Sequence, residues 1–574
     1  MADSERQQFD VIVVGGGTAG CIIASRLSSN PDLQVALIEA GEDTLPGHQD
    51  DVIWDSYPIV AYFDPRHHWR RLRVFYGEAP TGDNSAGGIY RYEQARVMGG
   101  GSSINGMMAN QGAPGDYDEW AALGAAGWEW DQVLPYFCRL ERDLDIRTER
   151  HGAEGPIPIR RVPESEWPEF SRVAGRALGR AGLSRIDDQN DGFEQAWFPI
   201  TINNEHDRRV STAAGYLTVE VRQRPNLTIL SDATVTRIAF DGSHVSGVDV
   251  RDRGGFRSRV LAAREVVVAA GAIHTPALLM RSGVGPAAEL SELGIGIVAD
   301  RQGVGQNLQE HPQIAVTSLL KPEARQPWSQ RRHIFAGFRY SSGIENCADV
   351  DMYGVVVNRG GWHSLGQKLG GFLIWVNKAY SQGRVSLVTP AVLAEPRVEF
   401  RFLSDERDLL RLTDGLLRLA RLYQDPEMRR VTYYPFATAY SEKSRDLAIV
   451  RRSTEWKLGP VAKGIDGPAS VRRRLMRRRV ASGPNLFEIV RDQAELEAFV
   501  RARTHGTWHC CGTARMGRES DPMAVTDPSG RVYGVQGLRV GDASLMPTVP
   551  RANTNLPVMM IGEKIAAAIL AERA

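Results

Sequence analysis

The chain has 574 residues, and its 69 lysine and arginine residues balance 69 aspartate and glutamate residues. This length is too great for one hydrophobic core, so two or more domains are expected, and the neutral charge argues against nucleic acid as the main partner. The polar N-terminus has no apolar signal segment, and no apolar run reaches the roughly 20 residues that cross a bilayer, so we expect no membrane insertion. Five scattered cysteines without CxxC spacing predict a reducing, cytoplasmic location and no metal site.

A β-α-β unit is expected at the start of the chain, over residues 9–40. The apolar strand 11–14 leads into the glycine-rich loop 15–20, a helix follows from Cys21, and a second strand, 35–38, ends at Glu39. An acidic residue at this distance from such a loop is where a ribose hydroxyl is held.

Each glycine of this loop has a physical role. Gly15 allows the tight turn, Gly17 lets the backbone approach a pyrophosphate, and Gly20 lets the helix and the strand pack closely. The N–H groups at the start of the helix are free to bind the phosphates. The pattern predicts a site for an ADP-containing dinucleotide, FAD or NAD.

A loop-rich stretch with many aromatic residues is expected over residues 54–92, and a second glycine cluster follows over residues 96–105. Further along the chain, apolar periodicity predicts strands and one helix that ends at a glycine. The strands are 226–238, 246–251 and 264–271, and the helix is 275–282.

Residues 317–504 alternate strand-like pieces with helices and are expected to form a separate, inserted domain. The strand-like pieces are 371–376, 383–387 and 397–402, and the main helix is 405–423. The arginine-rich run 471–480 is best interpreted as a solvated face. The alternative is a basic rim that attracts an anionic substrate or a membrane surface.

The C-terminal residues 504–562 carry the densest chemical signal. His509 lies in a glycine-rich turn, and a histidine is the side chain best suited to take a proton near neutral pH. Asn553 and Asn555 lie in a second turn, after a short strand at 538–540 and before a helix expected over 557–571. An asparagine amide could orient the oxygen that loses its proton. A thiol role for Cys510 and Cys511 would need an activating environment, so small size is the favoured reason for these cysteines.

Three segments resemble the glucose–methanol–choline (GMC) oxidoreductases, flavoenzymes that oxidise alcohols. They are residues 95–105, with Met98 where another aliphatic residue is usual, residues 271–285, and residues 303–312. The resemblance covers essentially the whole chain. Within the family, segments 116–120, 375–378 and 552–557 are most similar to oxidases of aromatic and furanic alcohols.

The resemblance implies an α/β fold with two domains. A Rossmann-like FAD-binding domain would comprise residues 1–160, 216–316 and 505–574. A substrate-binding domain, an antiparallel sheet flanked by helices, would comprise residues 161–215 and 317–504. The protein would be a monomer or a homodimer.

The resemblance also implies FAD as the cofactor. His509 would be the catalytic histidine and Asn555 its partner, with Trp375 and Trp508 as pocket walls. Ile104 stands where members with covalent FAD have a histidine, which implies non-covalent FAD. The residues implied at the cofactor are Gly15, Gly17, Thr18, Ala19, Gly20, Glu39, Ala40, Arg96, Met98, Gly100, Gly101, Ser103, Asn105, Gly106, Val235, Ala270, Asp542, Ala543, Asn553, Thr554 and Asn555.

The implied reaction is oxidation of a primary alcohol to the aldehyde, and onward to the acid through the hydrate, with O2 as the acceptor. The substrate would be aromatic, furanic or allylic, including lignin-derived alcohols. A carboxylated substrate also stays open, because its carboxylate could pair with arginines at Arg208, Arg209 or the run 471–480. Three alternatives stay open: a dehydrogenase that passes electrons to a quinone or cytochrome, a hydroxynitrile lyase on the same scaffold, and a non-catalytic FAD-binding module.

Overall fold

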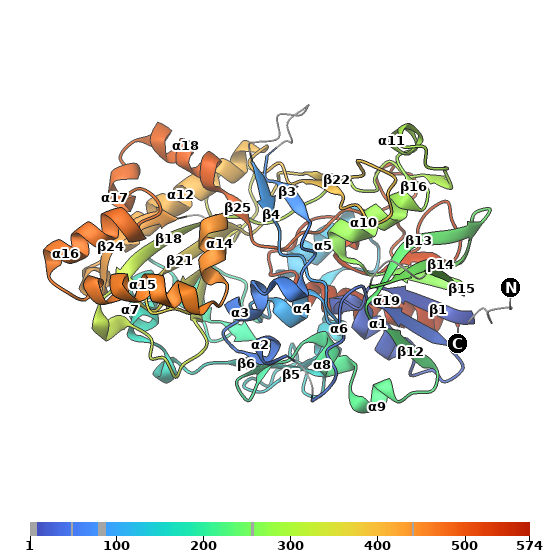
Figure 1. Cartoon of the computed structure of the whole chain (residues 1–574), viewed down its shortest axis with the longest axis horizontal. Coiled ribbons are helices and arrows are strands. Elements are labelled where there is room, and N and C mark those ends of the chain that lie inside the picture. Colours follow the sequence, from blue (N-terminus) through green and yellow to red (C-terminus); the bar gives the residue numbers. More distant parts are fainter. Residues whose placement is uncertain (1–7, 48–49, 78–87, 254–257, 439–440, 574) are drawn as a thin grey trace.

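The computed structural model describes residues 8–47, 50–77, 88–253, 258–438 and 441–573. Two large β-sheets organise these residues, one of seven strands and one of eight. Figure 1 shows the seven-stranded sheet at the end of the molecule that holds both termini, and the eight-stranded sheet toward the other end.

The seven-stranded sheet has the order β12-β2-β1-β15-β14-β13, with β26 paired to β15. Strands β12 (Leu227–Leu230), β2 (Val35–Ile38), β1 (Gln8–Val14), β15 (Ser258–Val268) and β26 (Leu538–Val540) run parallel, and β13 (Ala233–Asp241) and β14 (His244–Asp252) extend the sheet as an antiparallel pair. Residues 11–14 and 35–38 are all buried, as expected for parallel strands covered on both faces.

Helices α1 (Thr18–Leu27) and α19 (Asn555–Ala571) pack against each other beside this sheet (Figure 1). The β-α-β unit expected over residues 9–40 is confirmed, but its helix begins at Thr18 rather than at Cys21. Helix α10 (Gly271–Arg281) likewise begins four residues before the predicted start. In both cases the helix starts inside the glycine-containing turn, where sequence periodicity gives no signal.

The eight-stranded sheet is mainly antiparallel. Its order is β24-β18-β21-β20-β19-β8-β7, with β25 paired to β18. The central strands are β18 (Pro312–Leu320), β21 (Leu369–Val376), β20 (Met352–Val357) and β19 (Ile334–Tyr340). Helix α12 (Glu406–Leu422) packs on this sheet, and the side chain of Asp405 caps its first turn. An antiparallel sheet flanked by helices is therefore confirmed.

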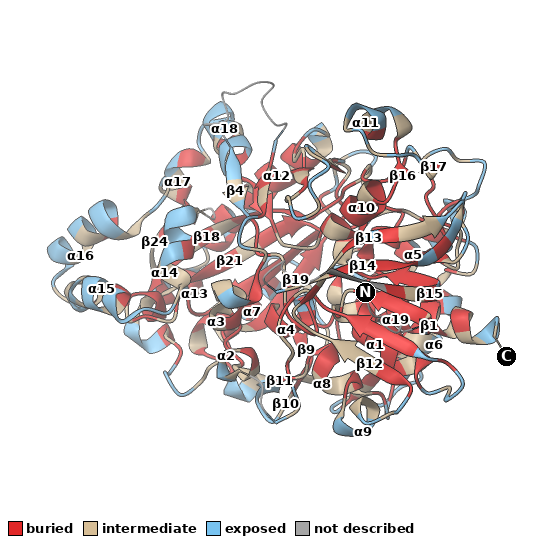
Figure 2. Ribbon diagram, turned by 45° about the vertical axis from the view of Figure 1, so that its right-hand side comes forward, coloured by how far each residue is buried: buried red, intermediate tan, exposed pale blue. Residues whose placement is uncertain are grey.

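The eight-stranded sheet contains four further strands. They are β24 (Thr432–Thr438), β8 (Ala196–Pro199), β7 (Ser184–Arg185) and β25 (His505–Gly506). Because β25 pairs with β18, the turn that carries His509 starts directly from this sheet. Figure 2 shows that the interiors of both large sheets are buried.

A smaller four-stranded sheet joins distant segments of the chain. Strands β22 (Arg384–Ser386) and β23 (Arg397–Glu399) pair in it with β3 (Arg73–Phe75) and β4 (Ile89–Arg91). The stretch 54–92, expected to be loop-rich, therefore contains regular structure, including helix α3 (Ile59–Tyr62).

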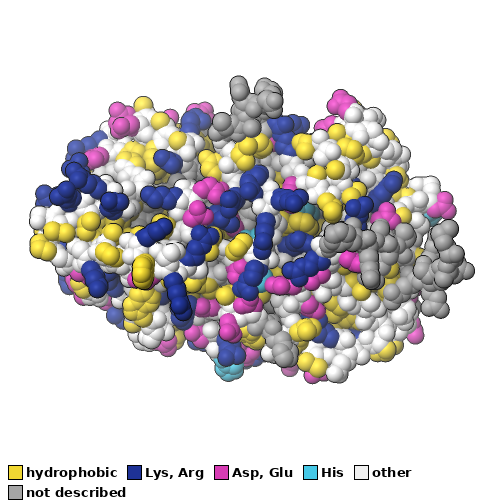
Figure 3. Space-filling view, viewed as in Figure 1, with side chains coloured by type: hydrophobic (Ala, Val, Ile, Leu, Met, Phe, Trp, Pro, Cys, Tyr) yellow, Lys and Arg dark blue, Asp and Glu magenta, His cyan; other side chains and the backbone are white. Residues whose placement is uncertain are grey.

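The arginine-rich run 471–480 forms helix α16 (Ala469–Leu475) and a following π-helical turn, Met476–Val480. These residues lie at the far left of Figure 1, and Figure 3 shows basic side chains gathered on that end of the molecule. Met476 is buried, whereas most of the arginines are exposed. Among the described residues, no helix combines the length and the apolar character needed to cross a membrane.

Candidate functional site

A cavity of about 460 Å³ is lined by residues of both large sheets. This volume lies within the range of small-molecule and cofactor sites. One part of its lining comes from the glycine-rich loop after β1, from Glu39 and from Val235 on β13. Another part comes from Trp375 on β21 and from the turn that holds His509. A ligand in this cavity would therefore touch both sheets.

The loop after β1 has the shape expected of a phosphate-binding turn. Gly15 has φ +102°, which favours glycine, and a Cβ atom on Gly20 would lie 1.8 Å from the carbonyl oxygen of Gly15. A Cβ atom on Gly17 would meet no protein atom closer than 3.8 Å, and Gly17 lines the cavity. No side chain caps the start of helix α1, so its first N–H groups remain for an anion. This loop fits the pyrophosphate of a dinucleotide.

Two buried carboxylates are fixed by the backbone at the wall of this cavity. Glu39 accepts hydrogen bonds from the N–H groups of Gly16 (2.9 Å) and Gly41 (2.7 Å), and burial raises its pKa to about 7. Asp542 accepts from the N–H of Gly271 (2.8 Å), and burial raises its pKa as well. Because the hydrogen bonds hold each carboxylate in place, each can present an acceptor oxygen to ligand hydroxyl or amide groups.

Most of the residues expected at the cofactor line the cavity, and four lie behind its wall. The side chain of Met98 is within 2.5 Å of where a Cβ on Gly16 would be, and Ser103 donates to the carbonyl of Met98 (2.7 Å). Arg96 donates to the carbonyl of Ala40 (3.0 Å) and covers the ring of Trp69. With Gly20, these residues support the lining and do not form it.

His509 lies at the junction between this cavity and the eight-stranded sheet. Its Nε2 atom is 2.9 Å from Nδ2 of Asn553, and both residues line the cavity. Its Nδ1 atom is 2.9 Å from Nδ1 of His311 and 2.8 Å from Oγ1 of Thr507. Burial lowers the pKa of His509 well below its ordinary value, and the nearby His311 lowers it further. His509 is therefore neutral near pH 7, as a proton acceptor must be.

The partner of His509 differs from the expectation. Asn553, and not Asn555, contacts the imidazole; Asn555 is the first residue of α19, and its Oδ1 accepts a hydrogen bond from Thr18 (3.2 Å). The prediction that Asn555 is the partner of His509 is therefore wrong: Asn553 makes this contact. The physical reason is that α19 begins two residues before the predicted position, which turns Asn555 toward α1 and leaves Asn553 in the turn facing His509.

Sequence reasoning missed the carboxylate that supports the His509 turn. Glu310 is buried and accepts hydrogen bonds from the backbone N–H of His509 (2.8 Å) and from the hydroxyl of Tyr92 (2.7 Å). Burial raises its pKa. The only signal in the sequence is the family segment 303–312, in which Glu310 precedes His311.

Both predicted tryptophans line the cavity. Trp375 is stacked on Tyr353 (4.7 Å between ring centroids) and lies edge-on to His509 (6.4 Å). Trp508 has φ +63° and meets the ring of Tyr62 edge-on at 4.8 Å. The lining near His509 is thus rich in aromatic rings, which suits a flat apolar ligand.

Family models for GMC oxidoreductases match residues 9–313 and 379–562. The chain belongs to the GMC oxidoreductase family. It is 40% identical to the 5-(hydroxymethyl)furfural oxidase of Methylovorus sp. (strain MP688) over 573 residues. This alignment covers 98% of this chain and 99% of that protein. It is 31% identical to oxygen-dependent choline dehydrogenase 1 of Chromohalobacter salexigens, over 98% of this chain and 95% of that protein.

Among solved structures, pyridoxine 4-oxidase from Mesorbium loti is similar, with a TM-score of 0.80 and 26% identity over 97% of this chain and 98% of that chain. A fungal aryl-alcohol oxidase has the same fold, with a TM-score of 0.72 and 20% identity over 99% of this chain and all of that chain. The expected GMC fold is confirmed, and with the family comes the enzyme class: a FAD-dependent alcohol oxidoreductase.

The arginines considered for a carboxylated substrate do not line the cavity of this GMC enzyme. Arg208 is exposed and covers Trp54. Arg209 is buried and donates to Oδ1 of Asn105 (2.8 Å), so it supports the cavity wall from behind. The run 471–480 lies at the far end of the molecule (Figure 1). None of these arginines lies where it would meet a carboxylate in the cavity.

The cysteines next to His509 are poor nucleophiles. Burial raises the pKa of Cys510 to about 12, and it raises that of Cys511 well above its ordinary value. Both thiols therefore stay protonated near pH 7, and the thiolate is the nucleophilic form. That these positions need small side chains stays a prediction.

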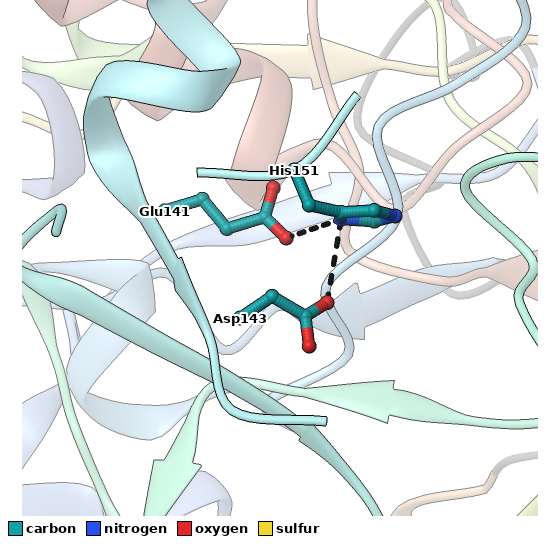
Figure 4. Close-up of side chains that lie close together, drawn as sticks. All are labelled: Glu141, Asp143 and His151. Atoms are coloured by element: carbon teal, nitrogen blue, oxygen red, sulfur yellow. Dashed lines mark hydrogen bonds and ion pairs between the residues drawn. The ribbon is translucent and has the colours of Figure 1, made fainter. Parts of the chain in front are cut away.

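A second cluster of titratable groups includes Glu141, Asp143 and His151 (Figure 4), none of which lines the cavity. His151 Nδ1 is 2.7 Å from Glu141 and 3.3 Å from Asp143, and its Nε2 is 2.6 Å from Asp188. Arg161 pairs with Asp143 (2.9 Å) and Asp188 (2.6 Å).

This cluster is an ion-pair network. Burial by itself would lower the pKa of His151, but the hydrogen bonds to Asp188 and Glu141 outweigh it and raise the pKa to about 10. A histidine that is protonated on both nitrogens cannot ligate a metal ion. Although Glu141, Asp143 and His151 are close enough to surround a cation, their carboxyl groups already pair with Arg161 and the charged imidazole.

Proposed function

We propose that this GMC oxidoreductase oxidises aromatic, furanic or allylic primary alcohols to aldehydes, with O2 as the acceptor and H2O2 as the second product. The observation that carries the proposal is the pair His509 and Asn553, whose Nε2 and Nδ2 atoms lie 2.9 Å apart at the wall of the cavity. The 5-(hydroxymethyl)furfural oxidase and pyridoxine 4-oxidase relatives support the substrate class.

The two side chains would act on the same oxygen atom. Neutral His509 accepts the hydroxyl proton of R–CH2OH at Nε2, and Asn553 donates a hydrogen bond from Nδ2 to the oxygen that becomes negative. Bound FAD supplies the acceptor for the hydride that leaves the carbinol carbon. Trp375, Trp508 and Tyr62 give the cavity flat apolar walls that favour an aromatic or conjugated R group.

We further propose that FAD is held without a covalent bond. Ile104 lines the cavity and offers no nucleophilic atom. Retention then depends on the loop after β1, the N-terminus of α1 and the carboxylate of Glu39. An aldehyde product could bind again as its hydrate, R–CH(OH)2, and present a hydroxyl group to His509, which would lead to the acid.

Substitution Gly17→Val tests this retention. The new side chain would extend into the cavity and occupy the space of the phosphates, because no protein atom lies within 3.8 Å of the Cβ position. We expect folded protein without yellow flavin, measured as the ratio of flavin to protein absorbance and by circular dichroism. Flavin at wild-type stoichiometry in the variant would contradict the proposed role of the loop.

The central test is anaerobic addition of alcohols to the FAD-loaded enzyme. We expect 5-(hydroxymethyl)furfural and benzyl alcohol to bleach the flavin, and the saturated analogue cyclohexylmethanol to do so much more slowly. An enzyme bleached equally by benzyl alcohol and cyclohexylmethanol would contradict the aromatic preference. Absence of bleaching with every alcohol would favour the hydroxynitrile lyase or a non-catalytic module.

The electron acceptor is tested separately. Under air, an oxidase forms one H2O2 per aldehyde, and its reduced flavin is reoxidised when O2 is admitted. A dehydrogenase would stay reduced in O2 and would be reoxidised by a quinone or cytochrome. The cytoplasmic location, the oligomeric state and the domain boundaries stay predictions.

A further inference from the structure

His311 lies behind His509, on the side away from Asn553. It is fully buried, and 198 positions separate it from His509 in the chain. Its Nδ1 atom is 2.9 Å from Nδ1 of His509, and its Nε2 atom is 3.1 Å from the backbone oxygen of Pro550. His311 does not line the cavity. It can therefore act on a substrate only through His509.

The carbonyl of Pro550 decides where the hydrogen of His311 lies. A carbonyl oxygen only accepts hydrogen bonds, so Nε2 of His311 carries the hydrogen and donates it. Burial lowers the pKa of His311 to about 3, and a neutral imidazole has one hydrogen. Its Nδ1 atom is therefore a bare acceptor that faces His509.

This acceptor in turn decides the hydrogen position on His509. Two bare Nδ1 atoms at 2.9 Å would share no hydrogen, so His509 must carry its hydrogen on Nδ1. Its Nε2 atom is then bare and faces Nδ2 of Asn553, a donor. The position of Asn553 is fixed because its Oδ1 accepts from Asn110 (2.8 Å).

Thr507 supplies a second acceptor at the same nitrogen. Its Oγ1 atom lies 2.8 Å from Nδ1 of His509. The hydroxyl hydrogen of Thr507 is directed to Glu310 (2.9 Å), which leaves a lone pair of Oγ1 for His509. Both neighbours of His509 Nδ1 thus accept, and both favour the same tautomer.

We propose that His311, assisted by Thr507, is a positioning residue that holds His509 in the Nδ1–H tautomer and so keeps Nε2 free to accept the alcohol proton. The hydrogen-bond chain runs from the carbonyl of Pro550 through His311 and His509 to the cavity. In the other tautomer, Nε2 would carry a hydrogen and could not accept a proton. The proposal rests on His509 being the base in the proposed function.

The first experiment measures flavin reduction by benzyl alcohol in anaerobic stopped flow, using FAD-loaded variants. His311→Leu removes the acceptor, and we expect the limiting rate of reduction to fall about tenfold, the value of one hydrogen bond, with the apparent Kd for alcohol unchanged. His311→Asn keeps an acceptor, Oδ1, where Nδ1 stood, and should recover most of that loss. The double variant His311→Leu/Thr507→Val should lose about a hundredfold.

His363→Leu is the matched control. His363 is also a buried histidine of lowered pKa, about 4, and it accepts a backbone hydrogen bond from Gly366, but it does not line the cavity. Its loss should affect stability and leave the reduction rate unchanged. A His311→Leu rate within twofold of wild type, or a His311→Asn rate no better than that of His311→Leu, would overturn the proposal.

The second experiment determines the tautomer of His509 by NMR and needs no catalytic turnover. In 15N spectra of protein labelled in histidine, the His509 signals, assigned by their loss in His509→Asn, should show a protonated Nδ1 and a bare Nε2. A hydrogen on Nε2 in the wild type would overturn the proposal even if His311→Leu fails to fold. If no alcohol reduces the wild-type flavin, the proposed function fails, and this spectrum still tests the tautomer.

Discussion

Two histidines in hydrogen-bonded clusters differ in charge near pH 7: His509 is neutral and His151 is a cation. His509 contacts an amide, a hydroxyl and a second neutral imidazole, and its pKa is far below the ordinary value. His151 contacts carboxylates on both nitrogens, and its pKa rises to about 10.

The difference shows that burial by itself does not decide what a histidine does. Burial disfavours the imidazolium in both places, but anionic partners outweigh that cost at His151 and neutral partners do not at His509. A bare nitrogen beside a cavity serves proton transfer. A permanent cation among carboxylates serves only to join chain segments. Each prediction below tests one side of this contrast.

The largest effect is expected for His509→Ala. Loss of the proton acceptor should slow flavin reduction by alcohol about 10³-fold, within the range found for general bases, with FAD content and thermal stability close to wild type. Anaerobic stopped flow measures the rate, and a fall of less than tenfold would refute the assignment of the base.

His151→Leu should lower the stability and leave the rate of flavin reduction unchanged. Removing the cation leaves Glu141, Asp143 and Asp188 to Arg161 alone, and a broken buried ion pair costs about 3–5 kcal/mol of the free energy of unfolding. Denaturant unfolding measures this cost, and the reduction rate of the folded fraction should stay at the wild-type value. Arg150→Ala, which removes a nearby exposed pair with Asp191, is the control and should cost about 0–1 kcal/mol.

The same cluster makes a pH prediction. Because the pKa of His151 is about 10 in the folded state and about 6.5 when unfolded, its contribution to stability is complete below pH 6.5 and is lost as pH rises toward 10. The unfolding free energy of the wild type should fall across that window. In His151→Leu the fall should be smaller, and an identical pH dependence would mean that His151 is not a cation in the folded protein.

Substitutions of Asn553 and Asn555 test which asparagine assists the neutral His509. Asn553→Ala should slow flavin reduction by about 10²-fold, the cost of removing one donor to a developing negative oxygen. Asn555→Ala is the matched control, because Asn555 bonds to Thr18 instead, and its effect on the rate should be less than about tenfold. The reverse ranking would restore Asn555 as the partner of His509.

The smallest effect concerns the pH profile of the reaction. Since the pKa of His509 lies well below its ordinary value of about 6.5, kcat/KM should stay level as pH falls through 6.5 and decline only at lower pH. An acid limb centred near pH 6.5 would show that His509 is solvated like a free histidine.

Much of the site could be predicted from the sequence because its signals are local. The loop 15–20 lies between a strand and a helix, so the phosphate turn and the need for Gly15, Gly17 and Gly20 follow from neighbouring residues. His509 could be found in the same way, since it stands in a glycine-rich turn that matches no packing pattern.

Only the tertiary structure decided which side chains meet. His311 and His509 are 198 positions apart, and His151 gathers partners from Glu141 to Asp188. The choice of Asn553 over Asn555 depended on where α19 begins. Local sequence fixes which conformations a turn can adopt, but the protonation state of a histidine depends on the charges that distant segments bring against it, and those are set by the packed fold.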